Sequence, residues 1–279
     1  MALPFLANVA PPAVIGMLHV PALPGSPRSR LSVPEIVDHV LAEAALFADH
    51  GVDALLLENM HDVPYLKAEA GHEVTACLTA VAVAVRARTS LPLGVQVLAG
   101  ANEAALAVAL AAGLSFVRVE GFVFGHVADE GWLDACAGPL LRLRRRLGAE
   151  QVAILADIKK KHAAHAATAD VSLAETAAAA AFAGADGVIV SGRSTGQPAE
   201  PADVTAAREA AGLPVLVGSG VSAENLHHYA TADAVIVGSS LKKGGHWAGA
   251  IDAARVAMLM ARARALRGGA DASPGAPPS

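Results

Sequence analysis

The sequence is poor in cysteine, with only Cys77 and Cys136 among 279 residues. The two lie far apart and form no CxxC motif, so nothing indicates a fold built on disulfides. We interpret both thiols as packing groups rather than nucleophiles. The same scarcity suits a reducing compartment, and we therefore expect a cytoplasmic protein.

Positive charge is also in short supply, since the formal net charge is −5 at pH 7. A chain without a global basic field lacks the electrostatic footprint of a nucleic-acid binder, so we expect no nucleic-acid partner. The one basic cluster, Arg142 with Arg144, Arg145 and Arg146, falls near the end of a predicted helix. There it complements the helix dipole.

No apolar run reaches the length of a membrane span, which needs about 20 apolar residues. The longest uncharged stretch, Met1–Pro27, is interrupted repeatedly by proline and lacks the cationic start of a secretory signal. We expect neither a transmembrane segment nor such a signal. Aromatic residues are only 4% of the chain, whereas alanine is abundant and favours packed helices.

The residues that are present alternate eight times between short apolar runs and helix-forming stretches. The runs are rich in Val, Ile and Leu without polar alternation, as expected of parallel strands buried on both faces. The predicted strands are Val14–Leu18, Ala54–Leu57, Leu93–Leu98, Phe116–Val119, Val152–Ala156, Val188–Val190, Pro214–Val217 and Ala234–Val237. The predicted helices are Pro34–His50, Glu73–Thr89, Asn102–Ala112, Trp132–Leu147, Leu173–Ala183, Asp203–Ala211, Ala223–Tyr229 and Ala250–Leu266.

Local signals at the ends of these helices support the alternation. Ser172 with Glu175 three residues on is a capping box, and several helices end at a glycine such as Gly113. Short loops into the next strand, combined with long crossover helices, give right-handed βαβ units. Eight units close naturally, so we predict an α/β fold, a single (β/α)8 TIM barrel over residues 1–267. Residues 268–279, rich in Gly, Ala, Pro and Ser, are predicted to form a disordered tail.

Function in such a barrel resides in the loops that follow the strands. Polar residues concentrate at these strand ends, whereas the residues entering each strand are mostly apolar, Gly or Pro. We therefore expect a site at this face. The predicted substrate-binding residues are His19, Asn59, Asp62, Gln96, Ser191, Gly192 and Arg193.

Two glycine- and serine-rich loops indicate a phosphate site. The last two predicted strands end in Gly218-Ser219-Gly220 and Gly238-Ser239-Ser240. Glycine lets the backbone approach an anion, and amides at a following helix start present partial positive charge to it. The alternative is that glycine merely turns the chain out of a strand. Two such loops on successive strands favour phosphate binding, which barrel enzymes often place here.

The loop after the fifth strand is the second candidate for chemistry. Asp157 is followed by Lys159, Lys160, Lys161 and His162, which bring an acid, ammonium groups and an imidazole close together in the chain. We predict Asp157 as a general base, Glu58 or Glu120 as the paired acid, and Lys161 or His162 as stabilisers of negative charge. The alternative is a solvated charge run. Arg118 and Glu120 share one strand face, so a structural ion pair between them competes with a catalytic role.

We predict no cofactor and no metal ligands. Glu58, His61, Asp62, His19 and Asp157 offer donors for a divalent ion, which remains the less favoured alternative because no fixed-spacing motif such as HExxH is present.

Six motifs fall in order along the chain: VIGMLHVPALPGSPR, DALLLENMHDVPY, ADIKKKHAAH, DGVIVSGRSTGQP, PVLVGSGVSAENL and AVIVGSSLKKGGHW. Together they resemble the BtpA/SgcQ family over about Val14 to Arg264. The resemblance implies a barrel of the ribulose-phosphate-binding type. The family's name-giving member is associated with photosystem I accumulation as an extrinsic membrane protein. Other members occur with carbohydrate-uptake genes, and members occur in non-photosynthetic organisms.

The resemblance also carries over to single positions. The matched residues are His19, Pro24, Gly25, Ser26, Glu58, Asn59, Asp62, Pro64, Asp157, Lys161, His162, Ser191, Gly192, Thr195, Gly196, Gly218, Ser219, Gly220, Gly238, Ser240, Leu241, Lys242 and Lys243. Three places depart from the family pattern. Ala99-Gly100-Ala101 stands where an Arg-Asn-Asp type triplet is expected, Met60-His61 where Phe-Gly is usual, and Glu120 where Asn is usual. These departures put the ordinary substrate, or catalytic activity itself, in question for this member.

The favoured hypothesis is an enzyme acting on a phosphorylated small molecule, such as a sugar phosphate or nucleotide derivative. Isomerase, lyase and phosphoribosyl or glycosidic-bond chemistry all fit. The alternatives are a non-enzymatic assembly factor for a membrane complex, which would associate peripherally with the membrane, and a metal-dependent hydrolase or aldolase. Because barrels commonly pair through helices or loops, we expect a homo-oligomer.

Overall fold

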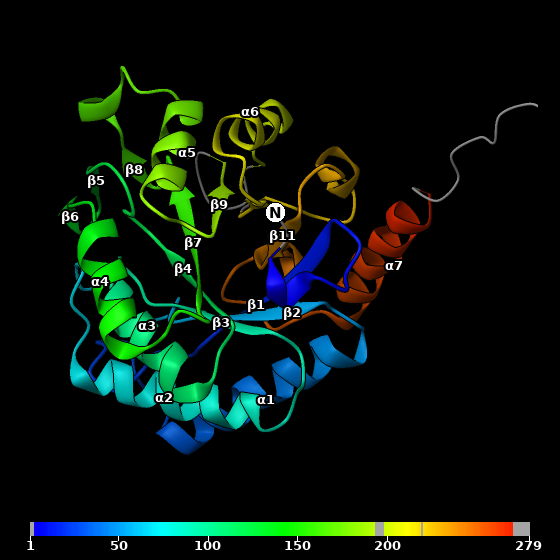
Figure 1. The fold of residues 1–279 in the computed structure, drawn as a ribbon. Coiled ribbons are helices and arrows are strands. Elements are labelled where there is room, and N and C mark those ends of the chain that lie inside the picture. Colours follow the sequence, from blue (N-terminus) through cyan, green and yellow to red (C-terminus); the bar gives the residue numbers. More distant parts are fainter. Residues whose placement is uncertain (1–2, 193–197, 219, 270–279) are drawn as a thin grey trace, which may run out of the picture.

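The protein was analysed as a computed structural model, which describes residues 3–192, 198–218 and 220–269. Its central element is a closed barrel of parallel strands in which β1 pairs with both β2 and β11 (Figure 1). The barrel strands are β1 (Ala13–His19), β2 (Ala54–Glu58), β3 (Leu93–Gln96), β4 (Phe116–Val119), β7 (Ala153–Ile158), β9 (Gly187–Val190), β10 (Val215–Val217) and β11 (Ala234–Val237). Every apolar run predicted to be a strand contributes one of them, and the predicted TIM barrel is confirmed.

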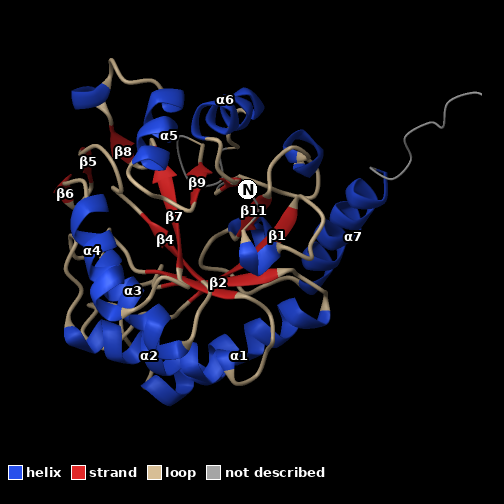
Figure 2. Ribbon diagram, viewed as in Figure 1, coloured by secondary structure: helices blue, strands red, loops and turns tan. Residues whose placement is uncertain are grey.

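Helices surround the barrel, as Figure 2 shows. They are α1 (Val33–Asp49), α2 (His72–Arg86), α3 (Asn102–Ala112), α4 (Ala137–Leu147), α5 (Leu173–Phe182), α6 (Pro201–Ala211) and α7 (Ala253–Gly269). The capping box of Ser172 and Glu175 is present, and Gly113 ends α3 in the left-handed conformation. Helix α7 extends to Gly269, and the rest of the predicted tail, residues 270–279, lies outside the described residues.

Two helix predictions were wrong. The stretch Trp132–Leu147 begins as strand β6 (Gly131–Leu133), which pairs with β5 (His126–Ala128), and β5 pairs in turn with β8 (Ala163–Ala164). Strands β5 and β6 form an antiparallel hairpin, which the helix predicted from Trp132 onwards did not anticipate.

The stretch Ala223–Tyr229 forms only a short 3-10 helix, η3 (Leu226–Tyr229). The Asn225 side chain donates to the Gly220 carbonyl and accepts from the Ser222 amide, so these residues close a turn instead of starting an α-helix.

The chain before β1 closes the amino-terminal end of the barrel. Phe5, in the 3-10 helix η1 (Pro4–Leu6), stacks on Phe116 with ring centroids 4.6 Å apart. Leu3 and Leu6 pack with the same interior cluster. None of the helices in the described ranges combines the length and apolar character needed to cross a membrane.

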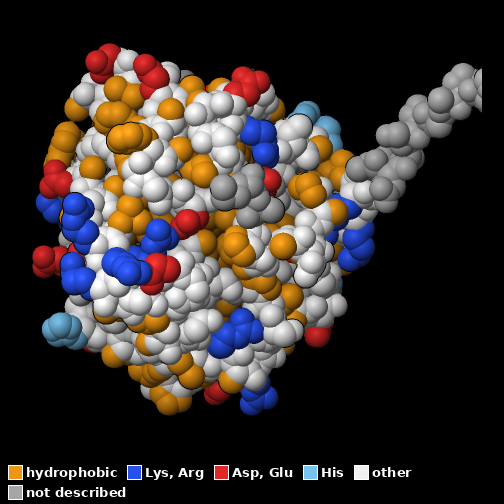
Figure 3. Space-filling model, in the orientation of Figure 1, with side chains coloured by type: hydrophobic (Ala, Val, Ile, Leu, Met, Phe, Trp, Pro, Cys, Tyr) orange, Lys and Arg blue, Asp and Glu red, His pale blue; other side chains and the backbone are white. Residues whose placement is uncertain are grey.

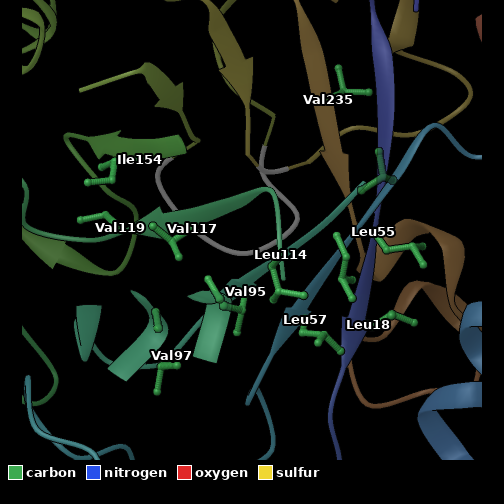
Figure 4. Packing of buried hydrophobic residues seen from close by; sticks show 14 of the residues in the cluster. Leu18, Leu55, Leu57, Val95, Val97, Leu114, Val117, Val119, Ile154 and Val235 are labelled. Atoms are coloured by element: carbon green, nitrogen blue, oxygen red, sulfur yellow. The ribbon is translucent and has the colours of Figure 1, made fainter. Parts of the chain in front are cut away.

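Strand periodicity determines which side chains reach the mouth of the barrel. Outward residues such as Leu55, Val95 and Val117 pack against the helices (Figure 4), whereas alternate residues such as Leu56 and Ile189 fill the interior. The next inward-facing position towards the carboxyl end of each strand is two residues further along the chain. It holds a polar residue or a glycine on every strand. These positions are His19, Glu58, Gln96, Arg118, Asp157, Ser191, Gly218 and Gly238, which we call the polar ring.

Candidate functional site

The polar ring lies at the carboxyl ends of the strands, beneath a cleft of about 800 Å³. A cleft of this size accommodates a small molecule. Many predicted site residues line it: His19, Glu58, Gln96, Glu120, Lys161, His162, Gly218, Gly220, Gly238, Ser239 and Ser240. Arg193 and Ser219, like the matched residues Thr195 and Gly196, lie outside the described residues.

Asn59 and Asp62 are not among the lining residues, because their side chains tie neighbouring loops together. Asn59 accepts a hydrogen bond from the Leu98 amide at 2.7 Å and donates to Asp62 at 2.9 Å. The other Asp62 oxygen accepts from the Leu23 amide at 2.7 Å. Both side chains are buried, so this arrangement supports the loops after β1, β2 and β3 instead of offering free groups to a substrate.

Asp157 is also occupied. Its two oxygens accept hydrogen bonds from Arg118 Nε at 2.8 Å and Arg118 Nη2 at 3.0 Å, and both side chains are buried. The geometry is that of a bidentate guanidinium–carboxylate pair. Asp157 is absent from the residues that line the cleft, whereas Arg118 is among them. Both oxygens of Asp157 therefore bind Arg118, and the general-base role of Asp157 stays a prediction.

Glu120 belongs to a second paired unit. Lys160 Nζ donates to Glu120 Oε2 at 3.0 Å, and Gln96 Nε2 donates to Oε1 at 3.2 Å. The alternative of an ion pair between Arg118 and Glu120 is not what the structure shows, because Arg118 pairs with Asp157 and Glu120 with Lys160. Burial raises the pKa of Glu120, and the Lys160 charge opposes this effect.

The three adjacent lysines point to different partners. Lys159 Nζ donates to the Thr168 carbonyl at 2.7 Å, and Lys160 binds Glu120 as described. Lys161 lines the cleft. Positive φ angles at Lys159 and His162 mark the tight turns that send successive side chains in different directions. Burial, and then the Arg118 charge, lower the pKa of Lys161.

Ser191 and Gly192 lie beside this loop, outside the set of lining residues. Ser191 Oγ accepts a hydrogen bond from the Lys161 backbone amide at 3.2 Å. The serine therefore holds the loop that carries Lys161.

His19 and Glu58 are neighbours in the polar ring and form no bidentate pair like that of Arg118 and Asp157. His19 Nδ1 donates to the Trp247 carbonyl at 3.1 Å, so Nε2 of the neutral ring is an acceptor, 3.6 Å from Glu58 Oε2. Burial, helped by the Lys242 charge, lowers the pKa of His19 to about 3 and keeps the ring neutral. Burial raises the pKa of Glu58, against the opposing charges of Arg118 and Lys161. A buried carboxyl with a raised pKa suits proton transfer near neutral pH.

The loops after β10 and β11 meet on another side of the cleft. Ser240 Oγ donates to the Val221 carbonyl at 2.6 Å and links the two loops. Arg255, on α7, donates to the Ser240 carbonyl at 3.1 Å and lines the same region. Gly218 and Gly238, the first glycines of the two loops, also leave room for neighbouring side chains. A Cβ at Gly218 would lie 3.2 Å from Arg118 Nη2, and one at Gly238 would lie 3.2 Å from His19 Nε2. Close packing against Arg118 and His19 therefore accounts for part of the glycine pattern from which phosphate binding was predicted.

Several lining residues were missed as site candidates from the sequence. Tyr65 and Trp247 give the cleft aromatic surface, and Tyr65 donates to the Met60 carbonyl at 2.8 Å. Trp247 lies within a quoted motif, which was a usable signal, and its ring contacts His61. Arg255 carried no signal, because an arginine on a surface helix has no distinctive pattern.

The donors considered for a divalent ion do not gather into one group. Asp62 and Asp157 are bound to the Leu23 amide and to Arg118, respectively. Within the described parts of the chain, no group of three or more His, Cys, Asp or Glu side chains is arranged to hold a metal.

Comparison with known proteins places this architecture in a family. The BtpA family model matches residues 11–265. The chain belongs to the BtpA family. An uncharacterized mitochondrial protein of Caenorhabditis elegans is 45% identical over 94% of this chain and 96% of its own length. The photosystem I biogenesis protein BtpA of Synechocystis is 36% identical over 91% of this chain and 89% of its own length.

Solved structures extend the comparison beyond the BtpA family. Phosphoribosyl anthranilate isomerase from Thermus thermophilus matches with a TM-score of 0.56 over 91% of this chain and 99% of that one. The two share 15% sequence identity, so the match establishes the fold alone. The BtpA family relative in the nematode is described as mitochondrial, and the cytoplasmic location expected for the present chain stays a prediction.

Proposed function

We propose that the protein binds a phosphorylated small molecule in this cleft and acts on it by acid–base chemistry. The observation that carries the proposal is that two glycine- and serine-rich loops, the buried carboxyl of Glu58 and the half-buried amine of Lys161 line one cleft. The loops would hold the phosphate, and the carboxyl and amine would act on the rest of the molecule.

Three features support phosphate at the loops after β10 and β11. Gly220, Ser239 and Ser240 line the cleft there, and glycine allows close approach of the backbone to an anion. Arg255 adds a guanidinium, the side chain best suited to phosphate oxygens. The structural neighbour is named for a phosphoribosyl compound and has the same fold, in which phosphate commonly occupies this position.

Glu58 is our choice for the general acid or base. It lines the cleft and is buried, and its carboxyl lies beside a neutral histidine instead of a bound cation. Arg118 and Lys161 would stabilise negative charge that develops on the substrate. Asp157 would act as a positioning residue through Arg118, and Glu120 would position Lys160. Isomerase, lyase and phosphoribosyl or glycosidic-bond chemistry remain the reaction classes that fit these roles.

Thermal unfolding in the presence of candidate ligands tests the proposal. The panel contains inorganic phosphate, sugar phosphates, phosphoribosyl compounds and nucleotides. A ligand at about a hundred times its dissociation constant adds roughly 2.7 kcal/mol to the free energy of unfolding, which raises the melting temperature visibly.

Two tryptophan variants make the test specific. Gly220→Trp places an indole in the cleft, and Gly113→Trp places one at the end of α3 with nearly the same backbone angle, since φ is 69° at Gly220 and 65° at Gly113. We expect the ligand-induced shift to vanish in Gly220→Trp and to persist in Gly113→Trp. No shift across the panel would refute the phosphate site and favour the assembly role that the Synechocystis relative's name describes.

A further inference from the structure

Lys161 differs from its two neighbours in what its amine contacts. Lys159 and Lys160 each donate to an oxygen of the protein, Thr168 and Glu120 respectively. Within the described part of the chain, no hydrogen bond or ion pair joins the Lys161 Nζ to another residue. Its backbone is nevertheless held in place, because the Lys161 amide donates to Ser191 Oγ. The backbone of Lys161 is therefore held by a hydrogen bond, whereas its amine has no hydrogen-bond partner among the described residues.

The tip of Lys161 lies among the groups of the polar ring. Lys161 lines the cleft together with Glu58 and Arg118, and its charge interacts with both. Burial and the nearby guanidinium lower its pKa and increase the fraction of free amine at neutral pH. A free, desolvated lysine amine is a nucleophile toward carbonyl carbon.

We propose that Lys161 forms an imine with an aldehyde or ketone group of the phosphorylated ligand, an inference that rests on the function proposed above. The Nζ lone pair attacks the carbonyl carbon, and the carbonyl oxygen takes a proton from the Glu58 carboxyl. The attacking nitrogen then returns one proton to the Glu58 carboxylate. Glu58 finally protonates the hydroxyl, the C–O bond breaks, and water leaves an iminium ion on Lys161. The exchange converts carbonyl, amine and one proton into iminium and water, with no change in oxidation state.

The surroundings of Lys161 fit these steps. Glu58 is buried with a raised pKa, which favours the protonated carboxyl that these steps require. The loops after β10 and β11 line the same cleft, so one small molecule could reach Lys161 with its carbonyl and these loops with its phosphate. An iminium ion withdraws electrons from the neighbouring carbon, which narrows the chemistry to isomerisation or carbon–carbon bond cleavage.

Borohydride trapping tests the inference directly. The folded protein is incubated with dihydroxyacetone phosphate or glyceraldehyde 3-phosphate, reduced with sodium borohydride, digested and examined by peptide mass spectrometry. Borohydride supplies the hydride that converts an imine into a stable secondary amine. We expect the adduct on the Lys161 peptide, at least tenfold more than on peptides carrying the exposed Lys67 or Lys243. It should disappear in Lys161→Arg and persist in the matched variant Lys159→Arg.

The unphosphorylated compounds, dihydroxyacetone and glyceraldehyde, separate the two proposals. A Lys161 adduct that is strong with the phosphorylated compounds and weak with the others supports both. An equally strong adduct with either set supports the imine and refutes the phosphate loops. Thermal stabilisation by phosphorylated compounds without any Lys161 adduct overturns the imine and leaves the phosphate site standing. Equal labelling of Lys161 and the exposed lysines also overturns it. Unfolding of Lys161→Arg at the wild-type temperature verifies that the variant is folded.

Discussion

The charged groups at the barrel mouth fall into two regions that differ in how they are paired. Around β4 and β7, Arg118 binds Asp157 through two hydrogen bonds and Lys160 binds Glu120 at 3.0 Å. In the rest of the barrel mouth, the Glu58 carboxyl lies 3.6 Å from His19. The amine of Lys161, in the loop after β7, forms no hydrogen bond or ion pair with another described residue. We call these the paired region and the open region.

Burial has different consequences in the two regions. Removing a charge from water is costly, and a bidentate partner offsets that cost, so the paired region holds fixed charges in a fixed geometry. Burial raises the pKa of Glu120 in the paired region, against the Lys160 charge. In the open region no hydrogen-bonded ion pair holds the groups, and burial raises the pKa of Glu58 and lowers those of Lys161 and His19. Groups with such shifts are suited to exchange protons or attack a substrate. Under the proposed function, the paired region supports the geometry of the site and the open region carries the chemistry.

The largest expected effect comes from breaking the paired region. Arg118→Met leaves Asp157 as a buried carboxylate without its cation, and should lower the free energy of unfolding by about 3–5 kcal/mol. Urea denaturation measures the loss. Arg118→Met combined with Asp157→Leu removes both charges and should recover much of it. A single variant as stable as wild type would contradict the structural role of the pair.

Breaking the open region should affect turnover instead. Once a phosphorylated compound that is converted has been identified, Glu58→Gln should reduce kcat by about 100- to 10,000-fold, the range for loss of a general acid or base. The exposed Glu69→Gln serves as the matched control. Full activity in Glu58→Gln would refute the proposed role of Glu58.

A smaller effect is expected where Arg118 of the paired region approaches Gly218, in one of the two loops proposed to bind phosphate. A Cβ at Gly218 would lie 2.6 Å from Ile189 Cγ2 and 3.2 Å from Arg118 Nη2. Gly218→Ala should therefore cost about 1–3 kcal/mol by overpacking. Ser239→Ala, in the other loop, removes atoms without adding any and should leave the unfolding midpoint nearly unchanged. Equal unfolding midpoints for the two variants would mean that the packing of Ile189 and Arg118 against residue 218 does not require glycine.

The smallest expected effect is a pH dependence at the edge of the paired region. Burial, with the Lys160 charge, lowers the pKa of His126 to about 4 from an ordinary value of 6.5. Between these values the unfolded chain binds more protons than the folded one, so stability falls as pH is lowered through that window. His126→Gln should remove this contribution, about 1 kcal/mol at pH 5, and leave stability at pH 8 nearly unaltered. Unfolding at both pH values, with the exposed His227→Gln as control, measures it.

The barrel could be predicted from the sequence because its signals are local. Apolar strand runs, capping boxes and terminal glycines each depend on a few adjacent residues, and α3 ends at Gly113 as expected. The β5–β6 hairpin and the short η3 were missed for the opposite reason. Strand β6 is stabilised by pairing with β5, and η3 follows a turn closed by the Asn225 side chain. Neither interaction leaves a helical or strand periodicity in the sequence.

The position of the site could be predicted from the sequence, but the pairing of its acidic and basic side chains could not. The period of two along the strands brings His19 and Glu58 to the mouth, and the chemistry of the residues that follow each strand was readable from the sequence. Which acid binds which base depends on distances between strands, and the bidentate contact that removes Asp157 from the cleft leaves no trace in the sequence.

The face of the molecule in Figure 3 shows why the cleft needed to be located by its buried groups. Basic and acidic side chains are interspersed with hydrophobic ones over that face, without a large field of one sign. The buried charged groups of the polar ring lie at the barrel mouth.

The division between the two regions is tested most directly by comparing the free energies of unfolding of Asp157→Asn and Glu58→Gln at pH 7. Each variant replaces one buried carboxyl of the polar ring by an amide of similar shape. We predict that Asp157→Asn loses roughly 3 kcal/mol, because Arg118 stays buried without its counter-charge, and that Glu58→Gln changes by less than about 1 kcal/mol. Equal losses, or a larger loss for Glu58→Gln, would contradict the account.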